Sequence, residues 1–568
     1  MESLTSIAHD LQLLRNETRH EISRLEQAAN TAYALTMAIV LLFMQAGFAM
    51  LEVGSVRERA VRDVLFKNMV DISVAAIAWF LLGYLLYSDT GNPFIGMPEM
   101  RMTNITVTPF AIIEESHKAL HGQAPSRYLL SFMFAATSAT IVSGAVAERT
   151  QQRAYIISSS LIVALVYPVA AHWVWSGRGW LSYGGDFAVS GGVFDFAGGG
   201  VVHLTGGVMA LVAAKVVGPR AGRYVSGSGP RRTKMRGHSS VHLVLGTILL
   251  WIGWLGFNCG SLSDITSPGA ATLAGQSAVR TTLAGSAGLL SATTAARFRK
   301  KVGPMGTWGV WSLEHACNGM LAGLVSITSG APVFSEWAAL AVGAIGGVVY
   351  YGTSHLVADI FRIDDVVDAF AVHGACGLWS LLAVGLLSDG ALPPGAADSA
   401  LPVPVRGAFA GGGGTLLAAE LLGALSLVLW SLAFGVTIFV PAKRLGILRI
   451  PEDFEVTGID IAELGRPAYS LRDAVGGGGG TPQSAVGRPI SVSPVDSVES
   501  NSFDAEADLE APGQGGGEGG GEGGGEGGDA DGAAGDGWAV GDANAAPLTA
   551  QAVVRIIPEG RPLREDAV

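Results

Sequence analysis

Residues 415–440 read TLLAAELLGALSLVLWSLAFGVTIFV, an apolar run in which Glu420 is the one charged residue. A helix rises about 1.5 Å per residue, so roughly 20 residues of this kind cross the ~30 Å hydrocarbon core of a bilayer. The run therefore predicts a transmembrane helix.

Ten further runs of similar length and composition precede this one. They lie at residues 32–54, 69–87, 128–148, 154–175, 200–218, 239–258, 270–296, 305–327, 334–356 and 370–388. In the 568-residue chain 49% of the residues are hydrophobic and 15% are charged, a balance too apolar for a soluble protein of this size. We therefore expect an all-α polytopic membrane protein with eleven transmembrane helices.

Lysine and arginine are distributed unevenly between the connections. The connections after odd-numbered runs hold most of them, as in the clusters Arg220 to Arg236 and Arg297 to Lys301, whereas the opposite side holds isolated cases such as Arg178 and Arg406. Basic connections remain in the cytoplasm. The N-terminus is therefore predicted outside and the C-terminus inside, which fits an odd number of spans.

The chain divides into four predicted parts. They are an extracellular N-terminal arm at 1–31, a transmembrane domain at 32–440, a cytoplasmic C-terminal regulatory region at 441–474 and a glycine-rich acidic tail at 475–568. From Asp473 onward there are 17 acidic and four basic residues, a net charge of −13, so the rest of the chain carries +1 of the total of −12. With almost no large apolar residues, the tail is expected to be disordered.

Two short stretches within the apolar part resemble each other. Asp195 begins one that ends Val-Val-His at His203, and Asp368 begins one that runs Ala-Phe-Ala-Val-His to His373. They lie five spans apart, and a repeat of five spans must insert in opposite orientations. We therefore predict an inverted 5+5 repeat plus one extra helix, with the two histidines close together near the bilayer midplane. A lone histidine in an apolar span is more often structural, but two in matching places favour a function.

The chemistry of two adjacent neutral imidazoles suits a small polar solute. Each ring offers one donor and one acceptor nitrogen, so the pair can share a proton and form hydrogen bonds in an otherwise apolar passage. Two charged rings would repel each other and any cation. The pair can therefore hold ammonia or pass a proton, with at least one ring neutral at rest.

Several longer stretches match one family. They are Met44 to Glu52, Phe134 to Arg149, His172 to Trp175, Asp195 to His203, Gly253 to Ser261, Cys317 to Gly323 and Asp368 to Gly374. Over about residues 30–470 the chain resembles the ammonium transporter (Amt/Mep/Rh) superfamily, most closely its plant and algal Amt branch. The resemblance implies a homotrimer of eleven-helix subunits in the plasma membrane, each subunit with its own pore, or a heterotrimer with paralogues.

The resemblance also implies the substrate site. Trp175, Phe134 and Ser261 would form an outer cup that recruits NH4+ or methylammonium, with Asp195 nearby to stabilise the cation. Cation–π contacts of this kind contribute about 0.5–2 kcal/mol each. On sequence alone, Trp175 could instead belong to the interfacial aromatic belt and Phe134 to ordinary helix packing.

The resemblance places the conducting path beyond that cup. Phe134 and Phe257 would stack as a gate, and His203 and His373 would line the pore below it. The expected mechanism is that NH4+ loses its proton and neutral NH3 passes, because a buried ion would carry the full desolvation penalty. Net movement of a proton or charge is expected, as in plant-type relatives.

The C-terminal region carries a further resemblance. Gly458 and Asp460 lie in a stretch that resembles the part through which one family subunit contacts and gates its neighbour, and cytosolic regulators could bind there. Plant-type members place a phosphorylatable threonine directly after this run, whereas this chain has Ala462. Control by phosphate at this position is therefore excluded.

Two alternative functions remain open at this point. One is a Rh-type passive channel for NH3 or CO2, which the Trp175 and Ser261 pair argues against. The other is an ammonium sensor with little transport. An enzyme is not expected, since no nucleophile-base set, metal cluster, cofactor motif or nucleic-acid site is evident. Three intramembrane acids, Glu52, Glu314 and Glu420, are expected to be structural.

Overall fold

The computed structural model describes residues 2–97, 125–186, 188–225, 231–262, 264–299, 311–390 and 405–469. The predicted tail at 475–568 and the end of the regulatory region lie outside these residues. Within the described residues the chain is helical except for a short antiparallel ribbon of β1 (Tyr224–Val225) and β2 (Arg231–Arg232). The all-helical fold class is confirmed.

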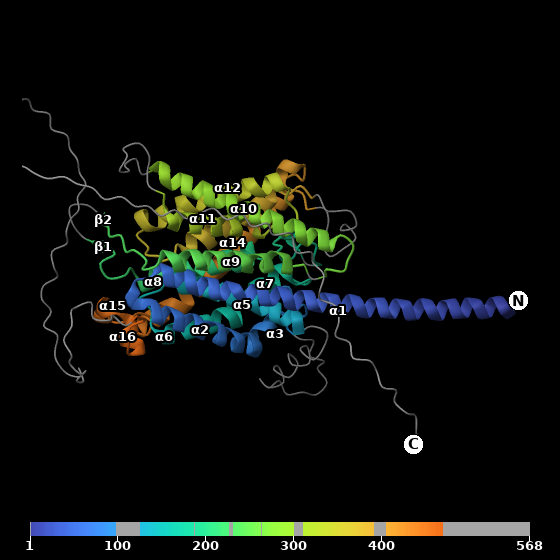
Figure 1. Ribbon diagram of the computed structural model, residues 1–568, viewed down its shortest axis with the longest axis horizontal. Helices are drawn as coiled ribbons and strands as arrows, with labels where there is room; N and C mark the ends of the chain where they lie inside the picture. The colour runs from blue at the N-terminus through green and yellow to red at the C-terminus, as the bar shows by residue number, and fades with distance from the viewer. Residues whose placement is uncertain are drawn as a thin grey trace, which may run out of the picture. The chain divides into compact units, whose positions relative to one another are not determined.

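The helices fall into two series along the chain (Figure 1). The first comprises α1 (Glu2–Ser55), η1 (Glu58–Ala60), α2 (Val61–Ala78), η2 (Trp79–Gly83), α3 (Tyr84–Tyr87), α5 (Pro125–Ala145), α6 (Gln152–Leu161), η3 (Ile162–Val166), α7 (Tyr167–Trp175), η4 (Val189–Gly191), η5 (Gly199–Leu204) and α8 (Thr205–Val217). The second comprises α9 (Ser240–Gly260), α10 (Ala270–Arg299), α11 (Leu313–Thr328), α12 (Glu336–His355), η6 (Leu356–Ile360), η7 (Phe370–Ala375), α13 (Cys376–Leu387), η9 (Ala408–Ala410) and α14 (Thr415–Arg444). Two short helices, α15 (Glu452–Thr457) and α16 (Ile459–Leu464), follow.

Each predicted apolar run overlaps a helix of the described chain, but several boundaries differ, as at α2, which begins at Val61 and not at 69. α1 begins at Glu2, so the arm predicted at 1–31 continues the first span as one helix of 54 residues. α11 begins at Leu313, where Ser312 accepts a hydrogen bond from the amide of His315. The predicted start of that span, at 305, lies outside the described residues.

Nine helical stretches in the described part of the chain are long and apolar enough to cross a membrane. α10 and α11 do not meet these criteria of length and apolar composition. α11 has only 16 residues. α10 carries Gln276, Arg280 and several serines and threonines along its length. These two helices contact each other extensively and both contact α12, so they are covered by neighbouring helices rather than by lipid alone.

Close helix contacts rest on small residues. α1 and α9 lie side by side over much of their length. A Cβ atom built on Gly47 would lie 2.7 Å from the amide nitrogen of Leu250, and one on Gly246 would lie 2.3 Å from that of Leu51. Small residues allow helix backbones to approach in this way within membranes. The first helices of the two series therefore pack backbone to backbone.

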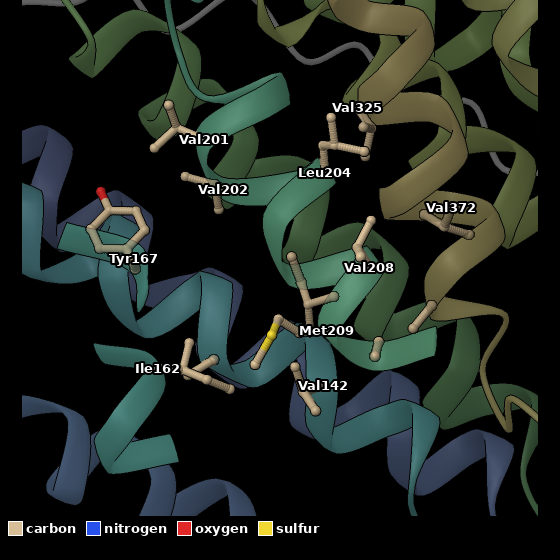
Figure 2. Packing of buried hydrophobic residues seen from close by; sticks show 14 of the residues in the cluster. Val142, Ile162, Tyr167, Val201, Val202, Leu204, Val208, Met209, Val325 and Val372 are labelled. Carbon is tan, nitrogen blue, oxygen red and sulfur yellow. The ribbon is translucent and has the colours of Figure 1, made fainter. Parts of the chain in front are cut away.

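The buried core is built from aliphatic side chains of several helices (Figure 2). Val142 of α5, Val208 and Met209 of α8, Val325 of α11 and Val372 of η7 are among those that pack together. The helices that bear His203 and His373 are therefore held in a densely packed apolar core.

The two histidine-bearing helices begin in the same unusual way. η5 and η7 are both π-helical stretches that lead directly into the regular helices α8 and α13. A Cβ atom on Gly207 of α8 would lie only 2.2 Å from the amide nitrogen of Gly374 in η7. π-helical turns are often found at functional sites. The close crossing at Gly207 and Gly374 brings the two histidines within reach.

Candidate functional site

An open cavity of about 520 Å³ lies at one end of the bundle. Trp175, Phe134, Ser261 and Asp195 all contribute to its wall. Trp175 ends α7, Ser261 directly follows α9, and Asp195 lies in the loop before η5, whereas Phe134 lies in the middle of α5. The fold thus brings together every residue that the sequence analysis assigned to an outer cup.

Aromatic and carbonyl groups set the geometry of the cup. The indole Nε1 of Trp175 donates to the backbone carbonyl of Asp195 at 2.6 Å. The rings of Trp175 and Phe134 meet edge to face, with centroids 5.8 Å apart and an interplanar angle of 81°. The hydroxyl of Ser261 donates to the carbonyl of Phe257 at 2.9 Å. Since its proton is used there, the serine oxygen can only accept from a bound cation.

The carboxylate of Asp195 caps the start of η5. It accepts hydrogen bonds from the backbone amides of Gly198 at 3.1 Å, Gly200 at 2.9 Å and Val201 at 2.8 Å. The side chain is 3% exposed. Carboxylates are stabilised at helix starts by free N–H groups. Asp195 therefore fixes the loop whose carbonyl holds Trp175, and it acts on the cup through that loop.

Two phenylalanines separate the cup from the interior. The rings of Phe134 and Phe257 have centroids 4.3 Å apart at 47°. On its inner side, Phe257 stacks on His203 at 5.2 Å, and Trp254 stacks on the same imidazole at 4.9 Å. The aromatic column therefore runs without a break from Trp175 to His203.

The two histidines are buried and adjacent. Nδ1 of His203 lies 3.2 Å from Nδ1 of His373, and the ring centroids are 5.2 Å apart. A hydrogen bond between two ring nitrogens needs one donor and one acceptor, so the pair shares one proton at this contact. Nε2 of His203 has no hydrogen-bond partner among the described residues. That nitrogen is free to bind a small polar solute.

The acid that matches Asp195 in the second series is Asp365, not Asp368. Asp365 accepts a hydrogen bond from the amide of Phe370 at 2.8 Å, at the start of η7. Both acids precede their histidine by eight positions, whereas Asp368 precedes His373 by five. From the sequence, Asp368 was matched with Asp195 because it is the acid nearest to His373. Asp368 instead has a left-handed φ of 60° and accepts from the hydroxyl of Tyr350 at 3.2 Å.

His172 is buried behind the cup, and the sequence did not indicate its role. Its Nδ1 lies 2.7 Å from the carbonyl of Ser88 and its Nε2 lies 2.8 Å from the carbonyl of Asn92. Carbonyl oxygens only accept, so both contacts are hydrogen bonds when the ring carries two protons. His172 therefore fastens the loop that holds Asp89, an exposed carboxylate on the cup wall. No local pattern announces this role, because the partners lie about 80 residues earlier.

The three other acids differ in position. Glu420 is buried and accepts from the amide of Phe194 at 2.9 Å. Glu52 is buried and bonded to Ser143 and Asn68. Glu314 lies in the first turn of α11 and is exposed. The structural role expected for it stays a prediction.

The C-terminal helices contact the start of α2. The carboxylate of Asp460 accepts from the amides of Arg62 at 3.0 Å and Asp63 at 2.8 Å, and Gly458 has a φ of 123° that favours glycine. Burial raises the pKa of Asp460, against the lowering effect of these two amides. Within the described residues, Gly458 and Asp460 thus form a joint between α15, α16 and the bundle.

An ion-pair network lies beside that joint. Arg220 pairs with Glu148 at 2.7 Å and with Asp364 at 2.8 Å. Burial opposes the charged form of Glu148, but Arg220 and Arg57 hold its pKa below the usual value. The described residues contain no group of three or more His, Cys, Asp or Glu placed to hold a metal ion.

A helical bundle with an aromatic cup, a phenylalanine gate and a buried imidazole pair belongs to the class of polytopic membrane channels and transporters for small polar solutes. Comparison with known proteins identifies the family within that class. The chain belongs to the Ammonium Transporter Family, whose model matches residues 32–469.

Individual relatives agree with that assignment. The chain is 38% identical to "Ammonium transporter 1 member 3" of Solanum lycopersicum, over 78% of this chain and 93% of the relative. It is 35% identical to "Ammonium transporter Amt2" of Archaeoglobus fulgidus, over 78% and 89%. Among solved structures, "Sensor Amt Protein" is similar at a TM-score of 0.65 and 26% identity, over 78% of this chain and 99% of the other. Candida albicans Mep2 is similar at 0.62 and 27%, over 75% and 87%.

Proposed function

We propose that this protein transports ammonium across a membrane by binding NH4+ at the outer cup and conducting NH3 past the two histidines. The observation that carries the proposal is the 3.2 Å contact between His203 and His373, buried directly behind the aromatic gate. Family membership supports ammonium as the substrate.

The cup supplies several weak attractions for a cation. The ring faces of Trp175 and Phe134 contribute cation–π energy of about 0.5–2 kcal/mol each, and the oxygen of Ser261 accepts a hydrogen bond. Below the gate, the imidazoles are surrounded by aromatic rings, and an ion there would lose its hydration. The cation therefore gives up its proton at or below the cup, and the neutral molecule continues.

The histidine pair also offers a route for the released proton. One proton already bridges the two Nδ1 atoms, and Nε2 of His203 can take up another as the bridging proton moves on. Transport then carries net charge. A passive channel of the Rh type would move NH3 without current, and the Trp175 and Ser261 cup favours the charged mode.

The wider organisation of the protein follows the same family pattern. We infer eleven transmembrane helices in an inverted 5+5 repeat plus one, with the N-terminus outside and the C-terminus cytoplasmic. The matching π-helical starts of η5 and η7 support the repeat. We further propose a plasma-membrane homotrimer, or a heterotrimer with paralogues, controlled through Gly458, Asp460 and cytosolic regulators. The four-part division at residues 31, 440 and 474 belongs to this proposal.

The test is electrical recording with methylammonium at two external pH values in wild type, His203→Ala and His373→Ala. We expect saturable inward current in wild type. Each alanine variant should lose current by at least about tenfold, because the proton can no longer pass between two rings. His242→Ala, outside the pore at the start of α9, should conduct normally. Undiminished current with unchanged pH dependence in both pore variants would contradict the mechanism.

A sensor with little transport is the second candidate, and the structural likeness to a protein named "Sensor Amt Protein" favours keeping it. The same recordings separate the two. Absence of both current and methylammonium uptake in folded wild-type protein, with a preserved signalling response to ammonium, would select the sensor. Uptake without current would select the passive channel.

A further inference from the structure

A second, closed cavity adjoins the histidine pair on the side away from the cup. Its volume is about 10 Å³, close to the space that one water-sized molecule needs. The wall includes His373, Phe48, Asn318, Thr140 and Glu52. Ammonia is about as large as water. A molecule that leaves the histidines therefore enters a chamber in which a carboxyl group is exposed to it.

The hydrogen bonds around Glu52 indicate whether its carboxyl group carries a proton. Its Oε1 is bonded to the hydroxyl of Ser143, and its Oε2 accepts from Nδ2 of Asn68 at 2.8 Å. The hydroxyl of Ser143 also lies 2.8 Å from the carbonyl of Thr140. A serine hydroxyl has one proton, so both of its contacts are full hydrogen bonds only when Glu52 carries a proton and donates it to Ser143.

An acid beside the path of a neutral solute is compatible with transport when its carboxyl group is protonated. A charged carboxylate beside the route of a neutral solute would be costly in the membrane interior, but a neutral carboxyl is not. When the proton leaves, Ser143 can turn its hydroxyl toward the carboxylate, and Asn68 already donates to it. The same two partners therefore support both states, as a group that exchanges protons requires.

We propose that Glu52 is the acid that returns a proton to ammonia once it has passed the histidine pair. The proton of the Glu52 carboxyl moves to the lone pair of NH3, which leaves a carboxylate and NH4+. The ammonium ion departs toward the cytoplasm, and the carboxylate is reprotonated by hydronium from the cytosol. This inference rests on the proposed transport function and assigns its final step, in place of the structural role first expected for Glu52.

The groups that face Glu52 bear on any pH dependence. Lys67 and Asp71 approach from α2, Tyr155 from α6 and His373 from η7. Asp71 is an informative neighbour because it is equally buried and bonded to hydroxyls, those of Thr140 and Ser159, but does not line the cavity. Asp71→Asn is therefore the matched control for Glu52→Gln.

The experiment measures methylammonium uptake into oocytes or proteoliposomes with the internal pH set between 6 and 8 and the external pH fixed. In Glu52→Gln we expect the maximal rate to fall by about tenfold or more and its dependence on internal pH to disappear. The external KM should stay within about twofold, since the cup is untouched. Asp71→Asn should keep the internal pH dependence, and Glu52→Asp should restore part of the rate.

Two results would overturn the proposal. One is a folded Glu52→Gln protein with the wild-type rate and the wild-type response to internal pH. The other is an infrared difference spectrum of wild-type protein that shows no loss of a protonated-carboxyl band on loading with ammonium, a measurement that stands even where the variant does not fold. A wild type that takes up no methylammonium would instead refute the transport function itself.

Discussion

Two acids, Asp195 and Asp365, stand eight residues before the two buried histidines, His203 and His373, and their hydrogen bonds differ. Asp195 accepts three backbone amides, and its own carbonyl receives the indole of Trp175. Asp365 accepts from the amide of Phe370, with the amide of Ala369 also close, and its Oδ1 has no hydrogen-bond partner among the described residues. The same local design thus serves two different surroundings.

The difference shows how a repeated element acquires distinct roles. Both halves use an acid to hold a π-helical start, which places a histidine in the bundle interior. In the first half the capped loop is also part of the substrate cup. In the second half the corresponding loop leads to the inner cavity, and its acid retains an oxygen that can still accept a hydrogen bond.

The largest effect is expected where the two halves cross. In Gly207→Ala the new Cβ would meet the backbone of Gly374 at 2.2 Å, which neither helix can relieve without moving its histidine. We expect loss of methylammonium transport and unfolding at lower temperature. The control is Gly352→Ala in α12, where a Cβ has nothing within 4 Å and helix propensity should add about 1 kcal/mol of stability. Normal transport by Gly207→Ala would show that the crossing is not tight.

The two acids themselves give the next largest effects. In Asp195→Asn, charge-assisted bonds from three amides are replaced by at most one neutral acceptor, and we expect a loss of roughly 3 kcal/mol in unfolding free energy with current lowered at least tenfold. In Asp365→Asn fewer such bonds weaken, so the loss should be smaller, about 1 kcal/mol. Thermal unfolding in detergent and current measured in parallel check this order. Equal effects would mean that the two halves are energetically equivalent after all.

A smaller effect is expected at the edge of the cup. His172→Phe leaves the carbonyls of Ser88 and Asn92 without their donors, and each loss destabilises the loop by about 1–3 kcal/mol. We expect the KM for methylammonium to rise a few-fold while the maximal rate changes little, because the pore is intact. A rate that falls without a change in KM would place His172 in the conducting step instead.

Much of the architecture could be predicted because it depends on composition along the chain. Eleven apolar runs located the helices, and the two Val-His stretches predicted the buried histidine pair. The helical form of residues 2–31 was missed because their many charged residues indicated a polar arm, although Leu4, Ile7, Leu11 and Leu14 recur at helical spacing. That segment is helical because it contains good helix formers and i,i+3 ion pairs such as that between Glu21 and Arg24, 3.0 Å apart.

The remaining parts of the site depend on contacts between distant segments. Asp365 was overlooked because a nearer acid, Asp368, fitted the local pattern, and only the backbone reversal at Asp368 separates their roles. His172 acts on a loop about 80 residues earlier, and Glu52 is bonded to side chains of α2 and α5. A hydropathy pattern cannot predict such contacts, since each partner taken alone is an ordinary polar residue.

The length of α1 has a mechanical consequence. At about 1.5 Å per residue its 54 residues form a rod of about 80 Å, far longer than the ~30 Å that a bilayer requires. Asn30 Oδ1 accepts from the amide of Ile265 at 2.9 Å and Ala34 lines the cup, so the rod leaves the bundle beside the cup. Residues 4–29 are exposed, so about 40 Å of this helix extends beyond the bundle on that side. Any partner that reaches the cup must approach alongside this rod.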